Sequence, residues 1–474
     1  MKHQTKIVAT VGPASDSYEE LNKLVDAGVN VFRLNFSHGT HEQHAEVIQK
    51  IRRINEEKNL HIAILADLQG PKLRVGELQG ESLALSEGDI IAFTNEKEEI
   101  GTKDNIFISY PNLHLDCKVG ELILLDDGKI ETEIIEITSD NFIKAKVKTG
   151  GVLLPRKGVN LPYTNISLPS LTEKDLKDLD FIIEHELDWV GLSFVRKPKD
   201  IFDLRFLLTS KDAMTKIIAK IEKPEAVENL REIILASDGV MVARGDLGVE
   251  LPVEKVPMIQ KDIVRKCIHR AKPVIIATQM MESMMEKRRP NRSEMSDVAN
   301  AVMEGADAVM LSGETAMGKH PALVVKTMVD IIQEVEKEKT VYNRNLIPQP
   351  HSPSFLSDAL CYNACRIAED INADAIIGMT QSGYTGFMLS SFRPYSELFV
   401  FTQTKQLVNQ LSLSWGVKAF YYEENTDLDK MIETQISILK EKGLLHKGDV
   451  VVNTGSLPVT ERLPTNMVKI TKVK

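Results

Sequence analysis

The first 70 residues alternate between short apolar runs and longer amphipathic runs. Apolar runs such as TKIVATV at 5–11 have the length of buried strands. The segments between them space their apolar residues at helical intervals, as in SYEELNKLVDAGV at 17–29. Three apolar runs occur here, and the third ends at Asp67. Buried strands that alternate with helices predict a parallel sheet covered by helices.

The alternation is interrupted at residues 72–166, which contain almost no helical pattern. Short runs rich in Ile, Val and Leu are separated here by turn signals such as Asp126-Asp127-Gly128 and Gly150-Gly151. We therefore expect a small all-β domain, a β-barrel, inserted after the third strand.

Strands and helices alternate again from Thr172, which has the spacing of a helix start with Asp175. Five more strand–helix units follow, and with the three before the insert they make eight. Eight such units are the number found in a (β/α)8 TIM barrel. The alternative is an open doubly wound sheet, but the count favours the barrel.

A proline-containing linker at 343–353 precedes a new alternation of helix and strand that begins near Ser354. It predicts a separate α/β domain, so a chain of 474 residues would hold three domains at about 150 residues each. The expected domains are a catalytic barrel at 1–71 and 167–345, an inserted β-barrel lid at 72–166 and a regulatory α/β domain at 346–474.

Composition excludes several classes of protein. The net charge of −10 argues against a nucleic-acid partner, because phosphate backbones are held by an excess of Lys and Arg. The four cysteines are scattered without a zinc-site pattern, which indicates reduced thiols. No apolar run approaches the roughly 20 residues of a membrane helix, and the first residues carry no signal-peptide pattern. We expect a soluble cytoplasmic protein without a membrane partner.

Polar and charged residues follow seven consecutive predicted barrel strands, and active sites of such barrels lie at these ends. Glu222 and Asp246 end neighbouring strands and could share a Mg²⁺ ion, although two structural salt bridges are the alternative. Lys220 lies two residues before Glu222, on the same strand face. An ammonium there could stabilise a developing oxyanion, whereas a lone lysine at a strand end is more often solvated.

Arg33, Arg74 and Lys157 are candidates for binding phosphate oxygens. Arg74 and Lys157 lie at the two junctions of the insert and are expected to face the barrel mouth. An insert that brings these cations to a nucleotide would act as a lid. The sequence contains no Gly-x-x-x-x-Gly-Lys-Ser/Thr motif, so a nucleotide would not be held by a P-loop.

Six stretches resemble those of the pyruvate kinase family, in the family's order: RLNFSHG, DLQGPKLRVG, AKIEKPEAV, MVARGDLGVE, IATQMMESM and VMLSGETAMG. The resemblance covers essentially the whole chain. It implies phosphoryl transfer from phosphoenolpyruvate to ADP, which gives pyruvate and ATP in the last step of glycolysis. It also implies a requirement for Mg²⁺ or Mn²⁺ and a homotetramer.

The resemblance implies a role for each matching residue. Glu222 and Asp246 would bind Mg²⁺, and Lys220 would stabilise the enolate and the phosphoryl group in transfer. The substrate carboxylate would be held by the backbone of Gly245 and Asp246 and the hydroxyl of Thr278. Thr278, with water and Ser312, would protonate the enolate. Arg33 would contact the phosphoryl group, a second Mg²⁺ would arrive with the nucleotide, and the nucleotide side would be lined by Asn35, Phe36, Ser37, His38, Arg74 and Lys157.

One stretch departs from the pattern of relatives that require K⁺. Those relatives hold the ion at positions that correspond here to Asn35, Ser37, Asp67 and Leu68. In this chain Leu68 and Gln69 differ from that pattern, and Lys72 stands in place of a glutamate. Since a tethered ammonium could supply the missing charge, we expect activity to persist without K⁺.

In the C-terminal domain, hydroxyls and a glycine lie between a strand and a helix, at Thr380, Ser382, Gly383, Tyr384 and Thr385. Such a loop can hold a phosphate, and in relatives it binds a sugar-phosphate effector. The alternative is a loop that caps the helix without a ligand. Residues 455–466 lack the Trp- and Arg-bearing loops of relatives regulated by fructose bisphosphate, so the identity of the effector stays open.

Two other functions are considered. A metal-dependent lyase of the pyruvate-enolate type would leave the inserted domain, Arg74 and Lys157 without a role. A catalytically silent metabolite sensor would have no need of Lys220 and its neighbours. Arg244 is expected to brace its loop through an ion pair.

Overall fold

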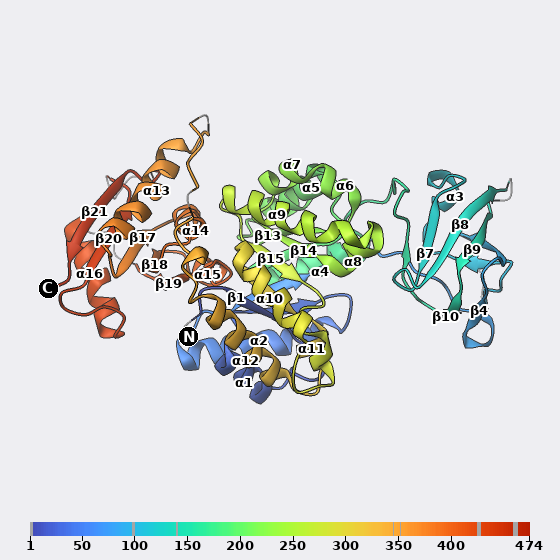
Figure 1. Ribbon diagram of the computed structural model, residues 1–474, viewed down its shortest axis with the longest axis horizontal. Helices are drawn as coiled ribbons and strands as arrows, with labels where there is room; N and C mark the ends of the chain where they lie inside the picture. Colours follow the sequence, from blue (N-terminus) through green and yellow to red (C-terminus); the bar gives the residue numbers. More distant parts are fainter. Residues whose placement is uncertain are drawn as a thin grey trace.

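The computed structural model describes residues 3–96, 100–138, 141–344, 346–350, 352–423, 428–457 and 463–474. Figure 1 shows a barrel in the middle of an elongated molecule, with the inserted β domain at one end and the C-terminal domain at the other. No helix in these ranges is both long enough and apolar enough to cross a membrane.

Eight parallel strands close into a barrel, because the first strand pairs with both the second and the last. The predicted (β/α)8 fold is thereby confirmed, and the open-sheet alternative is wrong. In the sequence, the insert lies between two strands that are neighbours in the barrel. These barrel strands are β1 (Lys6–Thr10), β2 (Val31–Asn35), β3 (Ala63–Asp67), β12 (Trp189–Leu192), β13 (Lys216–Ile221), β14 (Gly239–Ala243), β15 (Val274–Ala277) and β16 (Ala308–Leu311).

Helices surround the barrel, and capping side chains fix where several of them begin. Ser17 and Thr40 each accept a hydrogen bond from a backbone N–H of the first turn, and Thr172 does so in a capping box with Asp175, as predicted. The helices are α1 (Tyr18–Ala27), α2 (His41–Lys58), α4 (Glu173–Glu184), α5 (Pro198–Ser210), α6 (Pro224–Glu228), α7 (Leu230–Ala236), α8 (Arg244–Glu250), α9 (Val256–His269), α10 (Arg292–Glu304), α11 (Gly313–Ala316) and α12 (Pro321–Val335).

Side chains fill the interior of the barrel, so it is a packed core and not a pore. Val8, Leu65 and Ile218 are among the buried residues that meet there, and Trp189 lies with them. Leu413 of the C-terminal domain belongs to the same cluster. The Trp189 indole N–H donates to the Gln410 carbonyl at 3.2 Å, which joins the floor of the barrel to that domain.

Asp or Asn residues close the N-terminal ends of the barrel strands. Each lies just before one strand and accepts a hydrogen bond from the first backbone N–H groups of a neighbouring strand. Asn30 accepts from Ile7 at 2.9 Å, Asp188 from Ile64 at 2.8 Å, Asp238 from Ile217 at 2.8 Å and Asp307 from Val274 at 3.1 Å. These bonds satisfy buried donors that the parallel ladder leaves open at the floor.

The insert has its own buried core, in keeping with an all-β domain. Its strands form a six-stranded sheet in the order β11-β7-β8-β9-β5-β6 and a separate two-stranded ribbon, β10-β4. Residues 73–76 join the two edges of the six-stranded sheet, because Arg74 pairs with Gly158 next to β11 and Val75 pairs with Ile108 next to β6. This pairing is compatible with the small barrel that was expected, while β4 and β10 pair with each other outside it. The elements are β4 (Leu83–Leu85), β5 (Ile90–Thr94), β6 (Ile106–Phe107), α3 (Leu113–Asp116), β7 (Leu122–Leu125), β8 (Ile130–Ile137), β9 (Ile143–Thr149), β10 (Gly151–Leu153) and β11 (Val159–Asn160).

The C-terminal domain is an α/β layer structure, as predicted. Its sheet has the order β19-β18-β17-β20-β21, and its last strand runs antiparallel to β20. The elements are α13 (Phe355–Asp370), β17 (Ala375–Met379), α14 (Tyr384–Ser391), β18 (Glu397–Thr402), α15 (Lys405–Leu411), β19 (Val417–Tyr421), α16 (Leu428–Glu441), β20 (Val450–Gly455) and β21 (Met467–Lys472).

Candidate functional site

Arg33 and Lys220 meet over one buried carboxylate at the C-terminal ends of the barrel strands. The Arg33 Nε donates to Asp67 Oδ2 at 2.7 Å, and Lys220 Nζ lies 3.1 Å from Asp67 Oδ1. Burial opposes the charged form of Asp67, but Lys220 and Arg33 hold its pKa below the usual value. Asp67 therefore stays ionised and fixes the two cations that were predicted to contact substrate. Arg33 also donates to the Thr10 hydroxyl at 3.0 Å, a contact that the sequence did not suggest.

Lys220 bridges this cluster to Glu222, two residues along the same strand face. The Nζ lies 3.0 Å from Glu222 Oε1 and donates to the Ser193 hydroxyl at 2.7 Å. Burial lowers the pKa of Lys220, but Asp67 and Glu222 raise it more, and the pKa lies above its ordinary value. The ammonium is thus charged and held by three groups. Such a preorganised charge suits an oxyanion that develops during a reaction.

Glu222 and Asp246 provide two carboxylates at the ends of adjacent strands, β13 and β14. The sequence predicted that Asp246 ends its strand. In the structure β14 ends at Ala243, and Asp246 lies in the first turn of α8. Burial raises the pKa of Glu222, Lys220 lowers it, and the charge of Asp246 raises it further. The net shift is upward, so a cation between the two carboxylates would relieve their repulsion.

This donor set fits a divalent cation of the Mg²⁺ type. Mg²⁺ usually binds one or two protein carboxylates and completes its shell with substrate oxygens and water. Within the described ranges, no group of three or more His, Cys, Asp or Glu side chains is arranged to hold a metal ion.

Thr278 meets the loop after β14 in a strained conformation. Its hydroxyl accepts a hydrogen bond from the Gly245 N–H at 2.8 Å and donates to the Ala277 carbonyl at 2.7 Å. A Cβ at Gly245 would lie 3.4 Å from this hydroxyl, an ordinary van der Waals contact, so this hydrogen bond does not itself require glycine. Thr278 has φ of 67° and Gln279 of 55°, values that are rare for β-branched and other non-glycine residues. Strain of this kind is typical of functional sites.

Arg244 braces the loop between β14 and α8, as predicted. Its guanidinium is paired with Asp297 of α10 at 2.7 Å and donates to the Thr278 carbonyl at 2.6 Å. The same side chain donates to the Ala277 carbonyl at 3.2 Å. The arginine therefore fixes Gly245, Asp246 and Thr278 relative to one another.

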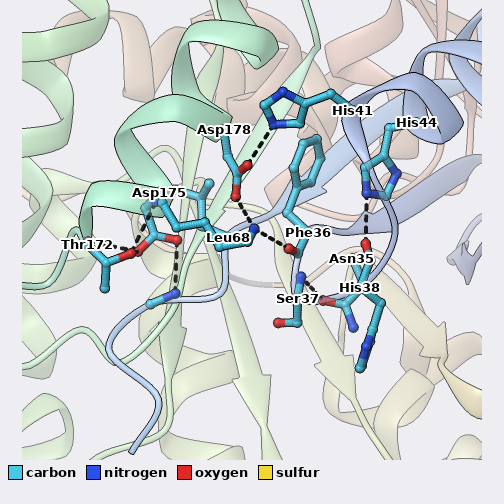
Figure 2. Close-up of polar contacts among 12 residues, drawn as sticks. Asn35, Phe36, Ser37, His38, His41, His44, Leu68, Thr172, Asp175 and Asp178 are labelled. Carbon is cyan, nitrogen blue, oxygen red and sulfur yellow. Dashed lines mark hydrogen bonds and ion pairs between the residues drawn. The ribbon is translucent and has the colours of Figure 1, made fainter. Parts of the chain in front are cut away.

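The loop after β2 carries four of the residues predicted to line the nucleotide side (Figure 2). The Asn35 side chain accepts from the Ser37 N–H at 3.1 Å, and the His38 side chain is exposed. The ring of Phe36 is only 2% exposed and stacks on His44 with 4.4 Å between ring centroids. Phe36 thus anchors the loop, and its side chain is turned away from solvent.

Residues of α4 that the sequence did not single out hold this loop in place. Lys174 donates to the Phe36 carbonyl and to Asp178, both at 2.6 Å. Asp178 also accepts from His41 at 2.8 Å (Figure 2). Asp175 accepts from the Gly70 N–H at 3.1 Å. The capping box at Thr172 located the helix, but contacts over more than 100 residues of sequence are not visible in local patterns.

The cations at the junctions of the insert contact their own domain. Arg74 donates to the Arg156 carbonyl at 3.1 Å, and Lys157 is paired with Asp126 at 2.9 Å. Lys72, in contrast, lies against the barrel and lines a cavity together with Phe194 and Asp246. Arg74 and Lys157 are not among the residues that line this cavity, so of the three junction cations Lys72 is the one that shares it with Asp246.

Glu250, at the end of α8, links the insert to the site and was missed in the sequence. Its Oε1 accepts from Asn160 of β11 at 2.7 Å and from Lys223 at 2.6 Å. Glu250 shares a helix with Asp246, and Lys223 directly follows Glu222. The position of the insert is thus tied to both carboxylates of the candidate metal site.

In the loop at Thr380–Thr385, two backbone N–H groups donate to hydroxyls of the loop itself. Gly383 has φ of 92°, and its N–H donates to Thr380 Oγ1 at 2.9 Å. The Tyr384 N–H donates to Ser382 Oγ at 3.4 Å. The Thr385 hydroxyl lies 2.7 Å from that of Thr465. Of the terminal segment 455–466, residues 458–462 lie outside the described ranges.

Comparisons with known proteins agree with this geometry. Residues 2–325 match the family model "Pyruvate kinase, barrel domain", and residues 358–471 match "Pyruvate kinase, alpha/beta domain". Pyruvate kinases of Staphylococcus epidermidis and Staphylococcus aureus are each 41% identical over 473 residues, which is 98% of this chain and 80% of theirs. A crystal structure of a pyruvate kinase from Cryptosporidium parvum is similar with a TM-score of 0.94 and 34% identity, covering 100% of this chain and 96% of that one.

Proposed function

Since the chain belongs to the pyruvate kinase family and catalyses phosphoryl transfer between phosphoenolpyruvate and ADP, we propose which of its residues carry the reaction. The observation that supports the assignment is the cluster in which Lys220 contacts Asp67, Glu222 and Ser193. Phosphoryl transfer depends chiefly on positioning and charge stabilisation, and this cluster provides both. The lyase and the silent sensor are not favoured.

Lys220 and Arg33 act on the transferring phosphoryl group and on the charge that develops on the enolate oxygen. Arg33 offers a guanidinium fork, which matches phosphoryl oxygens, while Asp67 holds its orientation. The backbone of Gly245 and Asp246 and the hydroxyl of Thr278 hold the substrate carboxylate. Thr278, with Ser312 and water, delivers the proton to the enolate carbon. The Ser312 hydroxyl is buried without a hydrogen-bond partner among the described residues, so it is free to take this part.

Glu222 and Asp246 would hold Mg²⁺ or Mn²⁺. The bound ion would supply positive charge next to the substrate oxygens. Other residues of the chain orient the two carboxylates. The Phe194 N–H donates to Glu222 at 2.7 Å, and Asp246 is held by the helix that Arg244 braces. The nucleotide side is served by Asn35, Ser37, His38, Arg74 and Lys157, and a second Mg²⁺ would accompany ADP there. Phe36 supports that side from beneath.

The insert at 72–166 works as a lid on the barrel at 1–71 and 167–345. Support comes from Glu250, which connects Asn160 of the insert to the metal-binding end of the barrel. Closure would bring Arg74 and Lys157 to the nucleotide and keep water from the reacting groups.

The monovalent-cation site at Asn35, Ser37, Asp67 and Leu68 is proposed to be dispensable, because Lys72 supplies a charge nearby. The support is that Lys72 shares a cavity with Asp246. The domain at 346–474 is proposed to be regulatory, with a phosphorylated effector at Thr380–Thr385. A homotetramer is proposed from the family, and the cytoplasm as location is supported by four unpaired cysteines.

One experiment tests activity and cation requirement together. The purified protein is assayed for pyruvate and ATP formation from phosphoenolpyruvate and ADP with Mg²⁺, in tetramethylammonium and in K⁺ salts. We expect similar rates in both salts. Loss of nearly all activity in tetramethylammonium, restored by K⁺, would refute the role of Lys72. A control variant, Lys72→Glu, should gain dependence on K⁺.

A further inference from the structure

Two stretches of chain connect the insert to the barrel. The first connector, residues 68–71, follows β3, and the second connector, residues 166–168, precedes α4. The side chains of Ile166 and Leu168 pack in the hydrophobic core of the insert. Between them, the Ser167 N–H donates to the Tyr110 hydroxyl of the insert at 2.9 Å. The second connector is therefore fixed to the insert.

Arg196, in the loop that follows β12, holds the second connector from the side of the barrel. Its two terminal nitrogens donate to the carbonyls of Ile166 and Leu168, the latter at 2.6 Å. The side chain is only 13% exposed, and hydrogen bonds from a charged donor are stronger than those between neutral groups. The planar guanidinium reaches both carbonyls at once, which the single ammonium of a lysine does less well. Arg196 thus ties the core of the insert to the barrel.

Other groups hold the backbone at Arg196. Asp200 accepts from the N–H groups of Arg196 and Lys197 at 2.9 and 3.1 Å. The Asn229 side chain donates to the Arg196 carbonyl at 3.0 Å. Since none of these hydrogen bonds involves the guanidinium, a substitution of the Arg196 side chain should release the second connector and leave the loop in place.

The same loop, residues 193–196, contacts the cluster around Lys220, and we call it the coupling loop. The Ser193 hydroxyl accepts from Lys220, and the Phe194 N–H donates to Glu222, both at 2.7 Å. Phe194 has φ of 54°, which is strained for an aromatic residue. Three residues of chain therefore separate the contact with Lys220 from the guanidinium that holds the insert.

The first connector also meets the coupling loop. The Ser193 hydroxyl donates to the Leu68 carbonyl at 2.7 Å. Gly70 has φ of 67°, and a Cβ there would lie 2.9 Å from the Phe194 ring and 3.0 Å from the Ser193 Cβ. Both the conformation and the close packing favour glycine at this position. The two connectors are thus held by one short loop.

From these contacts we propose that Arg196 is a positioning residue, which sets the orientation of the insert relative to Lys220 and Glu222 through the coupling loop. The inference rests on the proposed role of the insert as a lid. Without the guanidinium, the insert samples more orientations, so Arg74 and Lys157 meet the nucleotide less often. Phosphoenolpyruvate binds as before, because its proposed ligands lie on the barrel.

The orientation of the insert is measured as the distance between two spin labels by pulsed electron paramagnetic resonance. The labels are attached through Lys146→Cys in β9 and Lys177→Cys in α4, both at exposed positions, while the four native cysteines are buried. For the ligand-free protein we expect a narrow distance distribution with Arg196 present. The distribution should be broader in Arg196→Gln and intermediate in Arg196→Lys, which keeps the charge but not the fork.

The matched control is Arg205→Gln. It removes a guanidinium of α5 that is paired with Asp238 at the barrel floor, at 2.6 Å. This variant should keep the narrow distribution, because the substitution leaves both connectors and the coupling loop untouched.

Kinetic measurements give a second readout. Arg196→Gln should raise the ADP concentration at half-maximal rate by about tenfold, and the phosphoenolpyruvate concentration should stay within about twofold of the wild type. A general weakening of the fold would not separate the two substrates in this way. Arg196→Lys should recover part of the loss, and Arg205→Gln should change neither value.

The proposal is overturned if folded Arg196→Gln keeps the narrow distribution, or if the half-maximal concentrations of both substrates rise equally. Should Arg196→Gln fail to fold, the same two readouts on Arg196→Lys decide. Failure of the lid itself would look different: phosphoenolpyruvate, ADP and Mg²⁺ together would leave the label distance unchanged in the protein that retains Arg196. A broader distribution in Arg196→Gln would then still show that this residue sets the orientation of the insert.

Discussion

The two ends of the barrel use charged residues in opposite ways. At the floor, each carboxylate has a fixed set of donors: Asp307 accepts from the Val274 and Trp415 N–H groups, both at 3.1 Å, and is paired with Arg393. At the mouth, Glu222 contacts Lys220 and the Phe194 N–H, and the nearby charge of Asp246 raises the pKa of Glu222. Carboxylates with matched partners stabilise the fold, whereas like charges held close together mark the site of chemistry.

The largest effect is expected from Glu222→Gln at the mouth. Loss of a carboxylate that we propose binds Mg²⁺ should lower turnover by about 10³-fold and raise the Mg²⁺ concentration needed for half activity. The unfolding midpoint should stay close to that of the wild type. Glu232→Gln on exposed α7 is the matched control and should leave the rate unchanged. Normal Mg²⁺ dependence in Glu222→Gln would remove this residue from the site.

At the floor, Asp307→Ala is expected to lower stability and to leave turnover nearly unchanged. The substitution leaves buried Arg393 without its counter-charge and two N–H groups without an acceptor. We expect a loss of about 4 kcal/mol in the free energy of unfolding, measured by urea titration. Turnover of the folded fraction should remain within about twofold of the wild type. A large fall in turnover at unchanged stability would contradict the division between the two ends.

Asp188, a second carboxylate at the barrel floor, should make the free energy of unfolding depend on pH. Burial raises the pKa of Asp188 to about 7, although the Ile64 N–H and the charge of Arg52 lower it slightly. The pKa in the folded state therefore exceeds that of the unfolded chain. Asp188 does not lower the free energy of unfolding below about pH 4, but it does so increasingly as the pH rises toward 7.

Asp188→Asn should remove this loss, which we put at about 3 kcal/mol between pH 4 and 8. The measurement is the difference between the unfolding free energies of variant and wild type across that range. The difference should grow in favour of the variant as the pH rises. A constant difference would show that Asp188 does not titrate in this window.

The smallest effect is expected from Glu250→Gln, at a residue between the barrel mouth and the insert that we propose acts as a lid. Glutamine keeps the shape but removes the charge that faces buried Lys223 and Asn160. Weaker closure should raise the ADP concentration at half-maximal rate by about tenfold, with a smaller change in turnover. Glu133→Gln, in an exposed ion pair within the insert, should leave both values unchanged.

The fold and much of the site could be predicted from local patterns. Eight strand–helix units, the insert and the C-terminal domain follow from the spacing of apolar residues, and the strand ends identify Arg33, Lys220 and Glu222. The polar residues that follow the apolar runs predicted that Asp246 ends a strand. Asp246 lies in a helix instead, because β14 ends three residues earlier. The direction of a side chain beyond a strand end depends on loop conformation, which alternation does not encode.

A different reason explains why some functional residues could not be identified from the sequence. Thr10, Lys174 and Glu250 act through contacts between segments far apart in the chain, such as the hydrogen bond from Asn160 to Glu250. Each residue taken alone looks like an ordinary strand or helix end. Their roles become visible only when the barrel closes and the insert is positioned against it.

The most direct test of this account compares the two ends of one strand. Lys220 lies at the mouth end of β13 and Lys216 at its floor end, where its Nζ is 5.6 Å from the Phe387 ring centre. Turnover and unfolding free energy are measured together for Lys220→Met and Lys216→Met. We predict that Lys220→Met lowers turnover by about 10³-fold or more with the fold intact, and that Lys216→Met leaves turnover within about twofold. Similar losses of turnover in both variants, or normal turnover in Lys220→Met, would contradict the account.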